Sequence, residues 1–193
     1  MRIVLAITGA SGAIYGLRLL EELLKDGHRV TLVASASGRE VCSFETGVEL
    51  GDAEALKQRW GLPDADLTLR GVNDLWAPEA SGSAAPEALV IAPCSMGTVG
   101  RIAAGISGNL IERAADVMLK ERRPLILLPR ETPFSAIHLE NMLRLSQAGA
   151  RIVPAMPAFY QKPATMDDLI NFVVGKVMDQ LGISHSLFRR WGS

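Results

Sequence analysis

The chain has 193 residues, 48% of them hydrophobic, and a formal net charge of −1 at pH 7. This length suits one domain with a sizeable core. The balanced charge excludes the basic excess that is typical of nucleic-acid-binding proteins. Apolar runs stay below the roughly 18 residues of a membrane span, and Cys42 and Cys94 lack the spacing of a metal site. We therefore expect a cytoplasmic, single-domain protein with reduced thiols.

Short apolar runs alternate with helical periods along the whole chain. In chain order the pattern predicts a strand at 3–7, helix 13–25, strand 29–33, helices 39–45 and 52–60, strand 67–69, a loop at 77–86, strand 88–92, helices 95–104 and 109–121, strand 125–128, helix 135–147, strand 152–153 and helix 166–181. Thr132-Pro133 predicts an N-cap followed by proline before the helix at 135–147. This alternation predicts a doubly wound parallel sheet in a Rossmann-like or flavodoxin-like three-layer α/β sandwich.

The residues that follow four of the predicted strands are rich in serine, threonine and glycine. These stretches are 8–12, 34–38, 93–98 and 129–133. Ligands of parallel sheets bind at the carboxyl ends of strands, and hydroxyl and N–H groups at helix N-termini bind phosphate. The four loops favour a mononucleotide such as FMN. A tight turn without a ligand is the alternative interpretation of the first loop, TGASG.

The glycines of this first loop do not match the common nucleotide fingerprints. Counted from Gly9, the third and sixth positions of a dinucleotide motif are Ser11 and Ile14. The strand at 29–33 is followed by no acidic residue before Glu40, where a ribose ligand would be expected. No loop carries Gly-Lys-Ser/Thr. The sequence therefore argues against NAD, and against ATP bound through a P-loop.

Several charged residues have both a structural and a functional interpretation. Arg130-Glu131 directly follows a buried strand, which favours a role in the ligand crevice. Arg113 and Lys120 lie seven residues apart on one helix face with Asp116 between them, and a solvent-exposed salt-bridge stripe is the simpler interpretation there.

Four further residues also have both a functional and a structural interpretation. Tyr160 lies in the proline-bounded loop PAFYQKP, as a ligand or as a packed aromatic residue. Lys176 lies in the middle of a predicted helix, where a surface position is the default, and Glu45, near the end of a helix, could equally lie on the surface. Cys94 follows a strand, and a small buried residue is favoured over a nucleophile.

Five stretches together resemble the UbiX-type flavin prenyltransferases: TGASGAIYG (8–16), PEASGSAAP (78–86), APCSMGT (92–98), GNLIERAADVMLKERRPLILLPRETPFSAIHLENM (108–142) and PAFY (157–160). The resemblance implies binding of FMN and dimethylallyl monophosphate. It also implies attachment of the five-carbon unit to N5 and C6 of reduced FMN without a metal. The prenylated FMN would serve a UbiD-type decarboxylase. It further implies a dodecamer with sites at subunit junctions, and a tail at about 182–193 that packs on the site or on a neighbouring subunit.

Position by position, the resemblance assigns roles to residues of this chain. The expected flavin contacts are Gly9, Ala10, Ser11, Ser35, Ser95, Met96, Gly97, Thr98 and Arg130. The residues expected to hold the prenyl phosphate are Arg113, Lys120, Glu131, Tyr160 and Lys176, with Trp191 covering the site. Ser11 and Glu45 match residues near the flavin N5, and with Lys120 and Glu131 they form the expected catalytic set. The role of Trp76 stays open.

This residue set agrees with the chemistry, because a monophosphate is a poor leaving group that needs several cations and donors. Glu131 could act as a general acid or orient the cations. Two other functions stay open. An FMN-dependent decarboxylase of the same fold would need a catalytic histidine and a substrate-binding motif, which we do not find. A non-enzymatic FMN-binding subunit would not need the phosphate-binding set that is present.

Overall fold

The computed structural model describes residues 1–192, so Ser193, the end of the predicted tail, lies outside the described residues. In this part of the chain six strands form one sheet in the order β3-β2-β1-β4-β5-β6, and every neighbouring pair is parallel. The strands are β1 Arg2–Ile7, β2 Arg29–Ala34, β3 Leu67–Arg70, β4 Ala88–Cys94, β5 Leu125–Pro129 and β6 Arg151–Ile152. The predicted doubly wound parallel sheet is confirmed.

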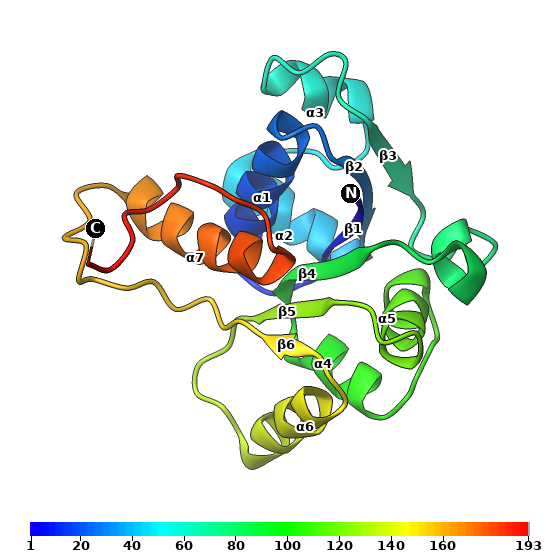
Figure 1. The fold of residues 1–193 in the computed structure, drawn as a ribbon. Coiled ribbons are helices and arrows are strands. Elements are labelled where there is room, and N and C mark those ends of the chain that lie inside the picture. The colour runs from blue at the N-terminus through cyan, green and yellow to red at the C-terminus, as the bar shows by residue number, and fades with distance from the viewer. Residues whose placement is uncertain (193) are drawn as a thin grey trace.

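Helices cover both faces of the sheet (Figure 1). They are α1 Ala13–Lys25, α2 Ala36–Thr46, α3 Ala53–Arg59, α4 Met96–Ala103, α5 Leu110–Lys120, α6 Ala136–Gln147 and α7 Met166–Leu181. One apolar cluster joins the sheet to α1, α2, α3 and α7, and a second joins its other face to α4, α5 and α6. The result is the predicted three-layer sandwich. The predicted loop at 77–86 holds two short 3-10 turns, η1 Pro78–Ala80 and η2 Gly82–Ala84.

The central strands are apolar on both faces because helices cover both. Every residue of β4 and β5 is buried, and this all-apolar pattern is what a parallel sheet between two helical layers requires. Helix α1 packs closely on β4 through Gly16, since a Cβ at that position would lie 2.3 Å from the Ala92 carbonyl oxygen. Leu17, Leu20 and Leu23 of the same helix are buried, and burial of each such side chain stabilises the fold by about 1.5–3 kcal/mol.

The predicted start of the helix at 135–147 is wrong in its details. Helix α6 begins at Ala136, and its N-cap is Ser135, whose hydroxyl accepts the N–H of His138 at 3.2 Å. The ring of His138 accepts the Ser135 N–H in return. This reciprocal pair satisfies the first-turn donors, so Thr132-Pro133 lies in the preceding loop and caps nothing.

The strand order places a crevice between β1 and β4. From β1 the chain continues to β2 and β3 on one side, whereas β4, β5 and β6 extend the sheet on the other. Where the order reverses, the loops after the two strands diverge and leave room for a ligand at their carboxyl ends. Among the described residues no helix is both long and apolar enough to cross a membrane.

Candidate active site

Thr8 joins the two strand ends that form this crevice. Its side chain is only 2% exposed. The hydroxyl donates to the Pro93 carbonyl at 2.9 Å and accepts the Ser95 N–H at 2.8 Å. The end of β1 is therefore fixed to the turn that leads into α4. The sequence analysis did not single out Thr8 among the residues of TGASG. Its position directly after a predicted strand was the one feature that could have indicated its role.

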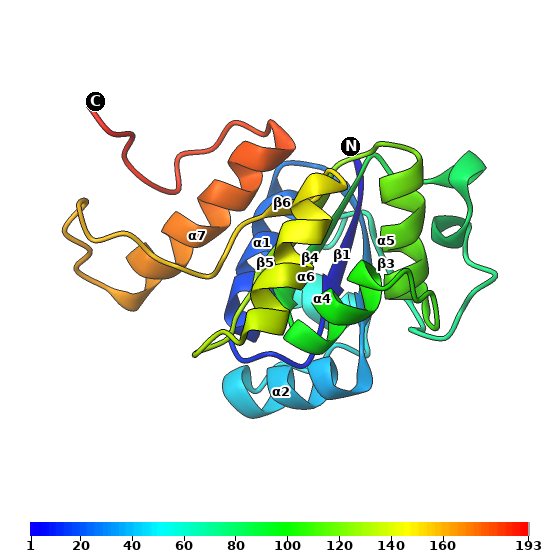
Figure 2. The same ribbon diagram turned by 90° about the horizontal axis from the view of Figure 1, so that it is seen from below.

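Three helices begin at this carboxyl edge, toward which β1 points in Figure 2. Helix α1 follows the TGASG loop through Gly12, whose φ of 101 favours glycine. Ser35 caps α2 by accepting the Gly38 N–H at 3.0 Å, and Ser95 caps α4 by accepting the Thr98 N–H at 3.3 Å. The capping hydroxyls also contact neighbouring hydroxyls, Ser35 that of Ser37 at 3.4 Å and Ser95 that of Thr98 at 3.0 Å. The edge thus combines helix N-termini with paired hydroxyl groups.

Glu45 lies at this edge and not on a remote surface. Its carboxylate accepts the N–H groups of Gly12 at 2.9 Å and Ala13 at 3.0 Å, across the gap between α2 and α1. Partial burial opposes its charge, but the hydrogen bonds from Ser11, Gly12 and Ala13 and the charge of Arg130 outweigh burial and lower the pKa of Glu45. Glu45 is exposed, but its carboxylate is held at the ligand edge and does not stand alone in solvent.

The position of Glu45 decides where a phosphate can bind. The N-terminus of α1 already faces a carboxylate, so a second anion there would be repelled. The first turns of α2 and α4 carry no acidic residue. The residues present fit a flavin mononucleotide, because the serine-capped N-termini of α2 and α4 suit a phosphate better than that of α1.

The charged pair after β5 also faces this crevice. Arg130 donates from Nε to the Ser11 carbonyl at 3.1 Å, which places its guanidinium beside the TGASG loop. Glu131 accepts the Thr132 N–H at 3.1 Å. The predicted position of Arg130-Glu131 at the ligand edge agrees with this geometry.

Arg113 and Lys120 form a second group, on α5. Arg113 donates to the Ala80 carbonyl at 3.0 Å and to the Asp116 carboxylate at 2.6 Å. Lys120 pairs with Glu121, and a Cβ at Gly82 would lie 2.8 Å from its ammonium nitrogen. Both cations border the loop at 77–86. Lys120 ends α5 just before β5 begins, so it lies toward the amino edge of the sheet, away from Ser11.

Tyr160 and Trp191 form a third group near the end of the chain. Lys176 of α7 is linked to it through the tail, with its ammonium nitrogen 6.0 Å from the centroid of the Phe188 ring, but it lines a different hollow. The rings of Tyr160 and Trp191 meet edge to face with centroids 5.0 Å apart. They border a hollow of about 520 Å³ together with Gln161, Lys162, Arg189 and Arg190. In Figure 1 α7 lies on the left and α5 on the right, with the sheet between them. Within residues 1–192, one chain holds the predicted site residues as three separate groups.

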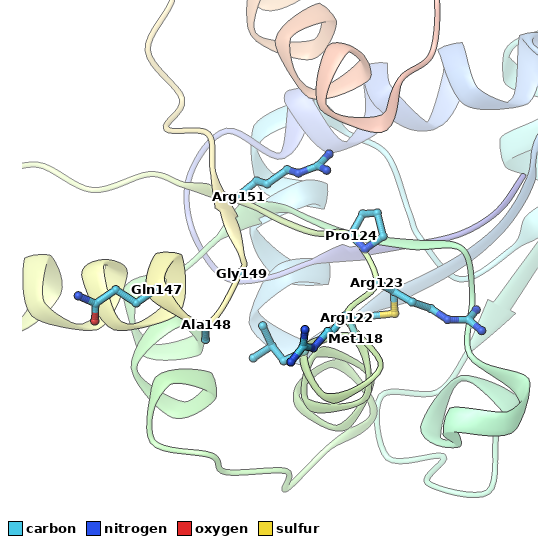
Figure 3. A pocket seen from close by; sticks show the side chains of 9 residues that line it. Met118, Arg122, Arg123, Pro124, Gln147, Ala148, Gly149 and Arg151 are labelled. Atoms are coloured by element: carbon cyan, nitrogen blue, oxygen red, sulfur yellow. The ribbon is translucent and has the colours of Figure 1, made fainter.

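Another hollow, of about 570 Å³, lies between the C-terminal ends of α5 and α6 and contains three arginines. In Figure 3 the side chains of Arg123 and Arg151 start from different segments and end well apart. Arg123 donates to the carbonyls of Ala85 and Pro86, and Arg151 donates to that of Gln180. Helix C-termini carry partial negative charge. The divergent guanidinium groups and the two helix ends make this hollow unsuited to a phosphate.

Neither a cysteine nucleophile at Cys94 nor a metal site agrees with the described side chains. Cys94 is fully buried, and burial raises the pKa of its thiol well above its usual range. Its interpretation as a small buried residue is confirmed. Within residues 1–192 no group of three or more His, Cys, Asp or Glu side chains is arranged to hold a metal ion.

A doubly wound sheet with helix N-termini and hydroxyl groups gathered at its β1/β4 crevice defines an α/β mononucleotide-binding protein. The sequence profile of the family described as Flavoprotein matches residues 1–178. The protein named flavin prenyltransferase UbiX from Halalkalibacterium halodurans is 54% identical over 187 residues, which cover 96% of this chain and 91% of the relative. Its namesake from Pseudomonas aeruginosa is 50% identical over 196 residues, covering 99% and 94%. The chain belongs to the flavin prenyltransferase UbiX family of flavoproteins.

Solved structures agree with this assignment. A UbiX protein in complex with FMN and dimethylallyl pyrophosphate superposes with a TM-score of 0.91 at 41% identity, covering 100% of this chain and 97% of the other. A dodecameric FMN-dependent UbiX-like decarboxylase from Escherichia coli O157:H7 has a TM-score of 0.91 at 42% identity and covers both chains fully. The peptidyl-cysteine decarboxylase EpiD is only 18% identical with a TM-score of 0.59, and it shares the fold alone.

Gly38→Ala tests whether the first turn of α2 is part of the flavin site. A Cβ at this position would lie 2.4 Å from the Ile7 carbonyl oxygen, so the helix start must move away from β1. We expect a loss of about 2 kcal/mol in the free energy of unfolding and weaker FMN binding, measured by urea unfolding and by quenching of flavin fluorescence. Gly71→Ala, where a Cβ meets open space, is the control. Unchanged FMN affinity in Gly38→Ala would exclude this turn from the site.

Proposed function

We propose that this protein transfers the dimethylallyl group of dimethylallyl monophosphate to N5 and C6 of reduced FMN, which yields prenylated FMN and inorganic phosphate. Membership of the flavin prenyltransferase UbiX family carries the general reaction. The carboxyl-edge site supports FMN as the flavin, since its serine-capped helix N-termini carry no acidic residue in the first turn and suit a phosphate.

In this reaction the C–O bond of the prenyl ester breaks, phosphate leaves, and N5 bonds to the freed carbon and gives up its proton. A proton then adds to the remaining double bond, C6 bonds to the carbon that becomes positive and gives up its own proton, and the flavin has gained C5H8. The protein's part is to stabilise charge as the ester bond lengthens. Arg113, Lys120 and Lys176 supply positive charge to the departing phosphate, and Tyr160 donates a hydrogen bond. Glu131 donates a proton to the phosphate or orients these cations. Ser11 and Glu45, which are hydrogen-bonded to each other, hold a proton beside the flavin N5.

The cations proposed for the donor lie in two groups, on α5 and on α7, which one chain keeps apart, so the proposed site needs more than one copy of the chain. Several large apolar side chains stand in solvent, among them Phe44 at 92% and Trp76 at 98% exposure. Such exposure is typical of surfaces that subunits cover. We infer a homo-oligomer, with a dodecamer as the expected size, in which the tail at 182–192 covers a neighbouring chain's site. Native mass spectrometry measures the number of subunits.

Prenyl transfer is tested by incubating the protein with reduced FMN and dimethylallyl monophosphate under anaerobic conditions. Mass spectrometry of the released flavin should show a gain of C5H8. A parallel reaction with the diphosphate identifies the donor. If folded, flavin-loaded protein leaves the flavin mass unchanged with both donors, the function is instead an FMN-dependent decarboxylase or an FMN-binding subunit. Transfer of the product to a UbiD-type decarboxylase and the cytoplasmic location stay predictions.

Ser11→Ala tests the serine beside the flavin ring. The side chain is exposed in the TGASG turn and a methyl group fits there, so the free energy of unfolding should change by less than about 0.5 kcal/mol. Loss of its hydrogen bonds should lower turnover by about 10- to 100-fold, measured as prenylated FMN formed per minute. Ser146→Ala, at an exposed position of α6, is the control. Full activity in Ser11→Ala would remove this hydroxyl from the mechanism.

A further inference from the structure

The carboxylate of Asp179, near the end of α7, is the shared partner of three basic side chains. It lies 3.4 Å from the Lys176 ammonium and 3.1 Å from Nε2 of His185. Both terminal nitrogens of Arg190 approach it at 2.8 Å, one at each oxygen. The Asp179 side chain is only 19% exposed. A lone surface ion pair contributes little, but this carboxylate joins a helix lysine to two residues of the C-terminal tail.

His185 contributes to this centre through both of its ring nitrogens. Its side chain is 2% exposed. Nδ1 accepts the Leu187 N–H at 3.2 Å, so the neutral ring carries its proton on Nε2 and donates it to Asp179. The Arg190 guanidinium, followed by the His185 ring, outweighs burial and holds the pKa of Asp179 at about 2. The carboxylate is therefore charged at every pH at which the protein works.

The tail follows α7 so closely that a side chain at Gly175 would not fit. A Cβ there would lie 2.6 Å from Cε1 of His185 and 2.6 Å from Cδ1 of Phe188. Phe188 packs on Phe172 with ring centroids 5.0 Å apart. Phe172 also contacts Tyr160 at 5.9 Å between centroids. One continuous set of contacts thus connects Asp179, through the tail, to the aromatic pair of Tyr160 and Trp191.

We propose that Asp179 is a positioning residue for donor binding: its contacts with Lys176, His185 and Arg190 fix the lysine and the Trp191 tail on α7 as one rigid unit. This inference rests on the proposed function, in which Lys176, Tyr160 and Trp191 bind the prenyl phosphate. Lys176 has a long, half-exposed side chain with many rotamers, and a fixed carboxylate one helical turn away restricts them. Lys176 and the tail can then contact the donor site of a neighbouring chain without losing conformational freedom each time a donor binds.

Asp179→Asn tests this role because it removes the charge and keeps the shape. We expect the KM for dimethylallyl monophosphate to rise about tenfold, while kcat and the Kd for FMN stay within about twofold. Hydrogen–deuterium exchange followed by mass spectrometry provides a readout besides activity. Amides of the peptide 183–192 should exchange at least about tenfold faster in the variant, because His185 and Arg190 lose the charged partner that holds the tail on α7.

Asp167→Asn is the matched control, since Asp167 lies on the same helix and pairs with Arg18 of α1 at 3.3 Å rather than with a tail residue. It should change neither the KM nor the exchange of 183–192. Unaltered exchange in Asp179→Asn would overturn the tail contact, and faster exchange with an unaltered KM would overturn the role in donor binding. If the unaltered protein shows no prenyl transfer, the proposed function fails, and the exchange experiment still decides whether Asp179 holds the tail.

Discussion

Lys120→Ala should abolish most prenyl transfer and leave FMN bound. The ammonium group is one of the few cations available to a departing monophosphate, and removal of one preorganised charge of this kind lowers kcat by about 100- to 1,000-fold. Lys120 lies on α5, away from the capped helices at the carboxyl edge, so the Kd for FMN should stay within about twofold. The measurements are prenylated FMN formed per minute and a flavin fluorescence titration.

Lys25→Ala is a close match for this substitution. Lys25 also ends a helix, is exposed to a similar extent, and pairs with Glu21 and Glu22 much as Lys120 pairs with Glu121. It lies outside the proposed site and should keep full activity. Loss of FMN binding in Lys120→Ala would place the lysine at the cofactor phosphate, and full activity would remove it from the donor site.

Thr8→Val should destabilise the fold and the flavin site together. Valine has nearly the same shape, but it leaves the Ser95 N–H without its acceptor and removes one of the two donors to the Pro93 carbonyl. A buried, unpaired polar group costs about 1–3 kcal/mol, and we expect a loss of about 3 kcal/mol in the free energy of unfolding. Because Ser95 caps α4, the Kd for FMN should rise at least about tenfold. Urea unfolding of flavin-free protein and fluorescence titration measure the two effects.

Thr68→Val is the control for this experiment. Thr68 is also a strand threonine, in β3, but its side chain is only partly buried, and the same isosteric change should alter stability by less than about 0.5 kcal/mol. A Thr8→Val protein as stable as the unaltered chain would show that the β1/β4 junction does not depend on this hydroxyl.

The pattern of the chain predicted the elements with the strongest periodicity. Helix α7 has the bounds expected from its apolar positions and ends before Gly182, and β4 and β5 read as short all-apolar runs. Element starts were predicted less well. The sequence offered Thr132-Pro133 as a plausible helix start, whereas the reciprocal hydrogen bonds of Ser135 and His138 place it three residues later.

Some residues of the candidate site could be predicted from the sequence and others could not. The hydroxyl-rich strand ends and Arg130-Glu131 could be read locally, because the end of a strand in a parallel sheet has a known location. The position of Glu45 could not, since its partners Gly12 and Ala13 lie more than 30 residues away in the chain. Asp179 was missed for a similar reason: its acidic side chain has ordinary helical spacing, and its importance lies in the tail that returns to it.

The sequence by itself determined the strands, the helices, the parallel sheet and the family, since these depend on local periodicity and on motifs that are continuous in the chain. Only the tertiary structure decided which charges meet. It placed Glu45 at the start of α1, fixed the β1/β4 junction through Thr8 and gathered the tail around Asp179, while it kept the cations of α5 and α7 apart. Contacts of this kind depend on how distant segments pack, and the order of residues along one element does not encode that packing.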